Sequence, residues 1–274
     1  MSAMTRKEFL LTVTAAATAA PLPYDAPKIL LIVAHPDDEY TFAATVYRAT
    51  RDLHATVDQV VITNGAGGYR YSQLAERFYH TSLTNAGEAR AHLPEIRKKE
   101  TIAAGRILGI RRHYFLEQKD ASFTQDRGEA FRDWDIRAVS GFLTNLLERE
   151  HYDFVFTILP TPETHGHHKA AALLAVRAVQ QLPEASRPVV LGGDPARSTD
   201  APGEFDGAAP IRFTRTQNDR IVVNWVIAEH KSQGLFQTDY NKHDEERFWI
   251  LKPRGGVAAG KTQKLFHALE SANN

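Results

Sequence analysis

The stretch ILLIVAHPDDE, residues 29–39, joins an apolar run to a histidine and three carboxylates. Its large aliphatic residues at 30–33 follow one another without alternation, which is typical of a strand buried on both faces of a parallel sheet. Pro36 disfavours helical geometry at His35, so His35 is expected where that strand ends. In open α/β sheets, ligands bind in the crevice beyond the carboxyl ends of the strands. These polar residues are therefore expected to lie at a binding site.

The rest of the chain alternates between strand-like and helix-like patterns. Such alternation predicts an α/β fold, here a Rossmann-like three-layer sandwich with a mostly parallel sheet. We also expect an edge hairpin or a small antiparallel addition near the carboxyl end. The predicted strands after the first cover residues 57–63, 113–116, 154–159, 189–191, 211–214 and 221–227. The predicted helices after the one that follows residue 38 cover 94–108, 130–150, 169–182 and 228–236.

Polar and glycine-rich segments separate these elements. The segment NGAGGYRY at 64–71 lacks the full spacing of a dinucleotide-binding motif, so a substrate loop is favoured over phosphate binding. Residues 72–94 are polar and are expected to form an irregular lid or insertion, and 192–210 an exposed loop. The substrate selectivity of the site is expected to depend on the loops within 64–94, 117–129 and 192–210.

The length and composition limit the number of domains and the class of partner. A chain of 274 residues, 43% hydrophobic, suits one α/β domain, which we place at residues 28–254 between a leader at 1–27 and a carboxyl-terminal tail at 255–274. With 33 basic and 33 acidic residues, the protein has no global basic field to attract nucleic acid or anionic lipid. We expect a small-molecule partner, and the sequence leaves a homo-oligomer open.

The amino terminus has the features of an export signal. Basic residues precede an apolar run from Phe9 to Ala20, which is too short for a comfortable membrane span. The segment TRKEFLL at 5–11 loosely resembles a twin-arginine signal, and residues 17–19 offer a cleavage site. We predict an exported protein, periplasmic or secreted. The alternative is a cytoplasmic protein whose leader is a short helix or disordered.

Two predicted strand ends carry histidines together with other polar groups, at residues 35–38 and 165–168. Neighbouring strands of a parallel sheet present such ends at one edge, where His35, Asp38 and His168 could form a two-histidine, one-carboxylate set. This set suits Zn²⁺ with an open position for water, or a non-haem iron centre. Because the chain has no cysteine, any metal must be held by nitrogen and oxygen. Asp37 is the candidate general base.

Each of these features also has a structural interpretation. An aspartate at 37 or 38 can simply cap the following helix. The histidines at 167–168 can belong to a solvated or backbone-bonded turn. Arg97 and Glu100 are three positions apart on a predicted helix and can form a surface ion pair of little energetic value. The residues taken one by one therefore leave a metal hydrolase and a purely structural reading open.

Taken together, the motifs resemble those of the LmbE-like, PIG-L zinc deacetylase family, in the family's order and over residues 28–236. The resemblance implies the family's fold and a zinc-dependent removal of an acetyl group from an N-acetylglucosamine-type conjugate, with Fe²⁺ or another divalent ion as alternatives. It implies His35, Asp38 and His168 as the metal ligands. The segments that carry it are AHPDDE at 34–39, IRKKE at 96–100, FL at 115–116 with Asp120, HGHH at 165–168 and HKSQ at 230–233.

The resemblance also implies roles for residues around the ion. Asp37 would be the general base, and His165 would stabilise the oxyanion or protonate the leaving amine. Arg97 and Asp120 match positions that contact the sugar. The chain departs from the family where Gly166-His167 replaces the Pro-Asp of HPDH, so the groups that orient the ligands must be arranged differently.

Other functions are compatible with parts of the same pattern. A zinc amidase acting on a different small amide would have the same metal site and a different pocket. A metal-dependent phosphoesterase would need carboxylates for a second ion, and no second cluster is obvious in the sequence. A non-catalytic sugar-binding protein would be expected to lack Asp37 or a ligand, yet all are present.

Overall fold

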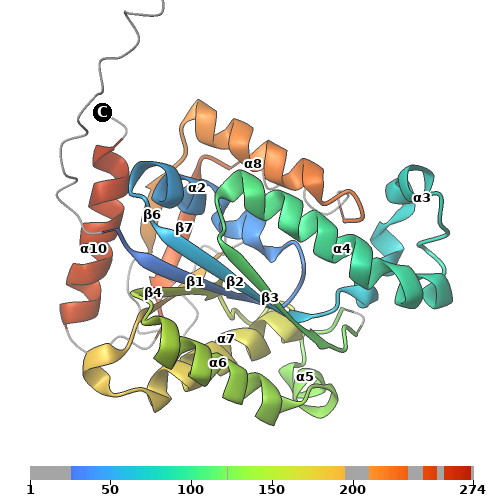
Figure 1. Cartoon of the computed structure of the whole chain (residues 1–274), viewed down its shortest axis with the longest axis horizontal. Helices are drawn as coiled ribbons and strands as arrows, with labels where there is room; N and C mark the ends of the chain where they lie inside the picture. Colours follow the sequence, from blue (N-terminus) through green and yellow to red (C-terminus); the bar gives the residue numbers. More distant parts are fainter. Residues whose placement is uncertain (1–25, 122, 195–209, 234–242, 252–255, 273–274) are drawn as a thin grey trace, which may run out of the picture.

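A computed structural model describes residues 26–121, 123–194, 210–233, 243–251 and 256–272 (Figure 1). Within these residues, seven strands form one sheet in the order β3-β2-β1-β4-β5-β7-β6. The predicted leader lies almost entirely outside the described part of the chain, as does most of the loop predicted at 192–210. The strands are β1 (Lys28–Val33), β2 (Thr56–Thr63), β3 (Arg112–Gln118), β4 (Phe154–Ile158), β5 (Val189–Gly193), β6 (Ile211–Thr214) and β7 (Glu245–Ile250).

The first five strands are parallel, and β1 lies between β2 and β4. Every residue from Ile29 to Val33 is fully buried. Successive side chains of a strand point to opposite faces, so Leu31 and Leu30 belong to different hydrophobic clusters on the two faces of the sheet. The continuous apolar run therefore fills two cores at once, as predicted for a central parallel strand.

Helices cover both faces of the sheet, which confirms the three-layer prediction (Figure 1). One face packs against α2, α4, α8 and α10, and the other packs against α5, α6 and α7. The helices are α2 (Ala43–Asp52), α3 (Gln73–Tyr79), α4 (Ala86–Leu108), α5 (Arg127–Asp133), α6 (Ile136–Glu150), α7 (Gly166–Gln181), α8 (Gln217–Glu229) and α10 (Gly256–Ser271), with 3-10 turns η1 (Asp38–Phe42), η2 (Ala66–Tyr71) and η3 (Glu184–Ser186). None of the described helices is long and apolar enough to cross a membrane.

The order of the strands reverses between β1 and β4. From β1 the chain continues outward to β2 and β3, whereas β4 and β5 extend the sheet in the other direction. The loops that leave β1 and β4 therefore emerge side by side at a topological switch point, where doubly wound sheets bind their ligands. The two histidine-bearing segments follow these two strands.

Several predicted elements differ from the structure. The segment 72–94, predicted to be irregular, contains α3 and the first turns of α4, which begins after Asn85. The Asn85 side chain accepts hydrogen bonds from the amides of Gly87 and Glu88, so the helix starts well before Pro94. The helix predicted at 130–150 is instead two helices, because Asp135 caps α6 after a break at Trp134.

The carboxyl-terminal third departs most from the prediction. Residues 221–227 are not a strand but part of α8, which starts with a capping box between Thr216 and Asp219. The predicted helix at 228–236 is wrong within the described residues, because α8 ends at Glu229 and a turn follows it. Residues 256–271, predicted to belong to a weakly patterned tail, form α10 and bury Leu265 and Phe266 in the core. The predicted antiparallel addition is confirmed as β6 and β7, although β7 was not expected at 245–250.

The antiparallel addition also supports α2, the helix that follows the loop after β1. The Glu246 carboxylate of β7 accepts hydrogen bonds from the amides of Ala44 and Thr45, both at 2.9 Å, in the first turn of α2. Arg215 donates to the same carboxylate at 2.8 Å, and both charged side chains are buried. A carboxylate that accepts from the free amides of a first turn caps the helix from outside its own sequence.

Candidate metal centre

The loops after β1 and β4 bring three potential metal ligands together. His168 Nε2 lies 3.0 Å from His35 Nδ1 and 3.0 Å from Asp38 Oδ1, and the remaining distance, from His35 Nδ1 to Asp38 Oδ1, is 3.7 Å. Ligand atoms around a tetrahedral zinc ion, at bond lengths near 2.0–2.1 Å, are separated by about 3.3 Å. The triangle therefore has the size that a zinc ion requires. The structure brings the three predicted ligands together, and their role as ligands stays a prediction.

Asp38 is held so that one oxygen faces this triangle. Its Oδ2 accepts hydrogen bonds from the amides of Ala34 and His35 at 2.9 and 2.8 Å, which leaves Oδ1 toward His168. Burial would raise the pKa of Asp38, but the adjacent histidines, His168 first, hold that pKa well below its usual range. The carboxylate is therefore ionised, as a metal ligand must be.

The electrostatic surroundings of His35 favour a cation. Burial would lower the pKa of His35, but the carboxylates of Asp120 and Asp38 outweigh it and raise that pKa to about 10. The same two negative charges would attract a divalent cation placed beside the ring. The donor atoms, the size of the triangle and the local charge thus all fit a metal ion.

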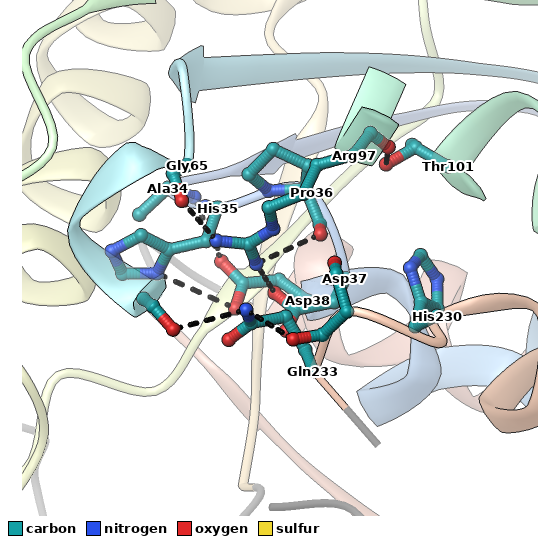
Figure 2. A network of polar contacts seen from close by, with 12 residues as sticks. Ala34, His35, Pro36, Asp37, Asp38, Gly65, Arg97, Thr101, His230 and Gln233 are labelled. Atoms are coloured by element: carbon teal, nitrogen blue, oxygen red, sulfur yellow. Dashed lines mark hydrogen bonds and ion pairs between the residues drawn. The ribbon is translucent and has the colours of Figure 1, made fainter. Parts of the chain in front are cut away.

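Asp37, the candidate base, is oriented by Arg97 (Figure 2). Arg97 Nη2 lies 3.0 Å from Asp37 Oδ1, and the guanidinium also donates to the carbonyls of Gly65 at 2.6 Å and Pro36 at 3.0 Å. Burial raises the pKa of Asp37 above its usual range, while Arg97 opposes the shift. A carboxylate whose pKa is raised toward neutrality is a better general base at that pH than an ordinary one.

Arg97 does not form the surface ion pair with Glu100 that its spacing suggested. Both side chains are buried, and Glu100 accepts hydrogen bonds from the Ser232 amide at 2.9 Å and from the Tyr79 hydroxyl at 2.8 Å. Arg97 thus links α4 to the loops after β1 and β2, whereas Glu100 links it to α3 and to the turn after α8. The guanidinium of Arg97 is engaged with the loops after β1 and β2. The sugar contact that the resemblance implies for Arg97 stays a prediction.

His165 caps α7 with its ring. Its Nδ1 accepts a hydrogen bond of 3.0 Å from the amide of His167, so in the neutral ring the proton is assigned to Nε2. Burial, together with the neighbouring histidines, His35 first, lowers the pKa of His165 to about 2. A neutral imidazole with a fixed Nε2 proton can donate a hydrogen bond to a developing negative oxygen. Phe123, 66% exposed, meets the His165 ring edge to face at 5.1 Å between ring centres.

Asp120 and His167 lie behind His35, on the side away from His168. His167 is fully buried, so it is not part of a solvated turn. Its Nδ1 lies 3.2 Å from His35 Nε2, and Asp120 Oδ1 lies 3.5 Å from that same nitrogen. A second group of potential ligands, His35, His165 and His167, shares His35 with the first. The structure therefore places Asp120 beside a candidate metal ligand.

Sequence reasoning missed a buried pair next to Asp37. Glu39 and His230 are both fully buried and in contact, and Gln59 donates to the other oxygen of Glu39 at 3.2 Å. Beyond His230, Gln233 donates to the Gly68 carbonyl at 3.1 Å. The HKSQ segment thus braces α4 and η2 around the site. Glu39 and His230 lie 191 positions apart, so the sequence could indicate this pair only through the two motifs that contain them.

Comparisons with known proteins agree with this arrangement. The family profile PIG-L, described as GlcNAc-PI de-N-acetylase, matches residues 30–179, more than half of the 274 residues. No curated protein matches the chain. Among solved structures, an N,N'-diacetylchitobiose deacetylase from Pyrococcus horikoshii is 20% identical, with a TM-score of 0.57 over 91% of this chain and 94% of that chain.

Other solved structures share the fold at similar identity. A deacetylase of teicoplanin biosynthesis, solved in complex with teicoplanin, is 17% identical, with a TM-score of 0.58 over 81% of this chain and 97% of that one. A 4-carboxy-2-hydroxymuconate hydratase from Pseudomonas putida is 15% identical, with a TM-score of 0.55 over 84% and 98%. At these identities the likeness shows a common fold, which in these relatives carries more than one reaction.

Proposed function

Because the chain belongs to the PIG-L family, we propose that it is a hydrolase that removes the acetyl group from the nitrogen of an N-acetylated sugar conjugate. The observation that carries the proposal is the triangle of His35, Asp38 and His168 next to the buried carboxylate of Asp37. These three ligands would hold Zn²⁺, with Fe²⁺ or another divalent ion as alternatives. An N-acetylglucosamine-type conjugate is the proposed substrate class.

The difficulty of amide hydrolysis lies in producing a nucleophile at neutral pH and in stabilising the negative oxygen that forms. When bound, a divalent cation polarises the acetamide carbonyl and makes a water molecule easier to deprotonate. Asp37 accepts the proton of the attacking water, and Arg97 keeps its carboxylate in one orientation. The new bond joins the water oxygen to the carbonyl carbon, and the carbon–nitrogen bond breaks.

His165 is proposed to stabilise the negative charge that develops on the carbonyl oxygen. With Nδ1 occupied by the His167 amide, its Nε2 proton is available to the oxygen that becomes negative. The departing amine needs one proton, which the protonated Asp37 can deliver, because the neutral ring of His165 could give up its proton only by becoming an imidazolate. Many side chains around the site are buried, and charges attract more strongly away from water, so these interactions are stronger than they would be in solvent.

An acetate-release assay on zinc-loaded protein tests this function. N-acetylglucosamine conjugates, chitooligosaccharides and peptidoglycan fragments are the substrates to compare, with Asp37→Asn as the matched inactive control. We expect equal amounts of acetate and free amine from at least one sugar. Release of a different acid from another amide would support the amidase alternative. Protein that contains zinc yet releases no acid from any amide would contradict the hydrolase proposal.

We also propose that the protein is exported. The support is the pattern of the first 20 residues, in which basic residues precede an apolar run. The test is the mature amino terminus, read by mass spectrometry of the protein isolated from its native cells. A terminus near Ala20 would support cleavage, whereas an intact Met1 on the bulk protein would contradict it.

A further inference from the structure

We propose that Asp120, together with His167, positions the candidate metal ligand His35, and that this is the part of the site built differently from the family pattern. The inference rests on the proposed metal centre and assigns a role other than sugar contact to Asp120. It also explains what occupies the place of the family's Pro-Asp, which is Gly166-His167 in this chain. Both are positioning residues, since neither belongs to the ligand triangle.

The two nitrogens of His35 face different groups. Nδ1 faces the ligand triangle, 3.0 Å from His168 Nε2. Nε2 faces a second group of atoms, 3.2 Å from His167 Nδ1 and 3.5 Å from Asp120 Oδ1, and these last two atoms are 3.4 Å apart. A histidine that binds a metal through one nitrogen commonly donates through the other to a carboxylate, which fixes the tautomer and the ring orientation. Asp120 supplies that carboxylate.

The placement of protons selects between two arrangements of this second group. If Nδ1 of His35 binds an ion, its proton lies on Nε2 and needs an acceptor. His167 Nδ1 could accept it, but the proton of His167 would then lie on Nε2, a buried atom that has no hydrogen-bond partner among the described residues. In the other arrangement both His35 and His167 donate to Asp120. We favour this second arrangement, because an ionised carboxylate accepts more strongly than a neutral imidazole and no buried N–H is left unpaired.

Asp120 is itself held in place by the glycine-rich loop. Its side chain is 3% exposed, and Oδ2 accepts a hydrogen bond of 2.9 Å from the Gly67 amide. A Cβ atom at position 67 would lie 2.4 Å from the Ala121 carbonyl oxygen and 2.9 Å from Asp120 Cγ. Only glycine therefore permits this close approach of η2. The glycine-rich segment at 64–71 thus supports a carboxylate of the site.

His167 is confined from the other side. Its ring is fully buried and lies 5.1 Å from the Trp134 ring, measured between ring centres. Trp134 is fixed in turn by a hydrogen bond of 3.0 Å from its indole to the Lys119 carbonyl, next to Asp120. The imidazole at position 167 therefore has little freedom to move, and it holds the side chains of Asp120 and His35 in place beside it.

The test measures zinc affinity by competition with a chromophoric chelator, and the absorption spectrum of the Co²⁺-substituted protein. The variants are Asp120→Asn and His167→Gln, compared with the wild type. Asp58→Asn is the control, since it removes a buried carboxylate in β2 that bonds Arg111 and Tyr152, away from the ligands. We expect Asp120→Asn to weaken zinc binding about 10–100-fold and to change the Co²⁺ spectrum, with a smaller loss for His167→Gln. Asp58→Asn should bind zinc as the wild type does.

Three results would overturn the inference. Wild-type zinc affinity and an unchanged Co²⁺ spectrum in Asp120→Asn, with a raised KM, would make Asp120 a substrate contact instead. Two zinc ions per wild-type chain and one per His167→Gln chain would make His167 a ligand of a second ion. A wild type that binds neither zinc nor Co²⁺ would overturn the proposed metal centre along with this inference, so the two failures are distinguishable.

Discussion

Arg97 Nη2 lies 3.0 Å from Asp37 Oδ1, and the guanidinium is 2% exposed. Because Arg97 also bonds the Pro36 and Gly65 carbonyls, the candidate base is tied to the loops that follow β1 and β2. Arg97 thus orients Asp37 and lowers its proton affinity, while burial acts in the opposite direction. The balance between these two effects sets how well Asp37 can act as a base.

Asp37→Asn should therefore retain metal and lose turnover. Asparagine is isosteric and can still accept from Arg97, but it cannot take a proton, so we expect kcat to fall about 100- to 10,000-fold. Acetate release and the zinc content of the same preparation are the two measurements. Activity near that of the wild type, with full zinc occupancy, would rule out Asp37 as the base.

His168→Ala should lose the metal. The substitution removes one of three ligand atoms, and the remaining pair, His35 and Asp38, is a weaker site. Zinc per chain, measured after purification and dialysis, should collapse. His165→Ala is the matched control from the same helix start, and it should keep zinc while kcat falls. An unchanged zinc content in His168→Ala would remove His168 from the ligand set.

Phe123→Ala should weaken substrate binding more than catalysis. Phe123 is 66% exposed, and it contacts the ring of His165, so a sugar that reaches the site can pack against it. Loss of an aromatic contact worth about 0.5–1.5 kcal/mol corresponds to a KM about 2–12-fold higher. Trp225, 54% exposed on α8 and outside the loops expected to set selectivity, provides the control, and Trp225→Ala should leave KM unchanged. Equal effects of the two variants would contradict a specific contact at Phe123.

Asp58 should stabilise the protein fully above about pH 4 and progressively less below it. Burial would raise its pKa, but hydrogen bonds from Arg111 and Tyr152 outweigh this, so the pKa of Asp58 is lowered in the folded protein. The unfolded value is about 3.9, so the carboxylate stabilises the fold above that pH, and the contribution disappears as pH falls through the lower folded pKa. The Tm difference between wild type and Asp58→Asn, followed by circular dichroism from pH 7 to 3, should shrink on acidification. A difference that is constant over this range would contradict the assignment.

The amino-terminal half of the sheet and the proximity of His35, Asp38 and His168 could be predicted because their signals are local. The apolar run before His35 identifies a doubly buried strand, and the histidines at 165–168 follow another apolar run. Strand order then brings the two ends together. The prediction at 221–227 failed because the β-branched residues Val222, Val223 and Val226 resemble a strand, whereas the capping box before them selects a helix.

Contacts between distant side chains could not be predicted in the same way. Glu39 and His230 each belong to a motif, but nothing in either motif states that they pair. The position of Asp120 depends on the absence of a side chain at Gly67, which becomes visible only when the two loops are placed side by side. Residues 72–94 looked irregular because the amphipathic pattern of α4 is weak on either side of Pro94, and tertiary packing decides where the helix begins.

The cap that Glu246 places on α2 has a consequence for synthesis of the chain. Glu246 lies 202 positions after Ala44, whose amide donates a hydrogen bond to it. A nascent chain that has emerged only as far as β5 therefore contains both histidine-bearing segments but not this cap. The loop bearing His35 and Asp38 leads directly into that uncapped helix. The helix that follows this loop therefore gains its cap only after almost the whole polypeptide has been synthesised.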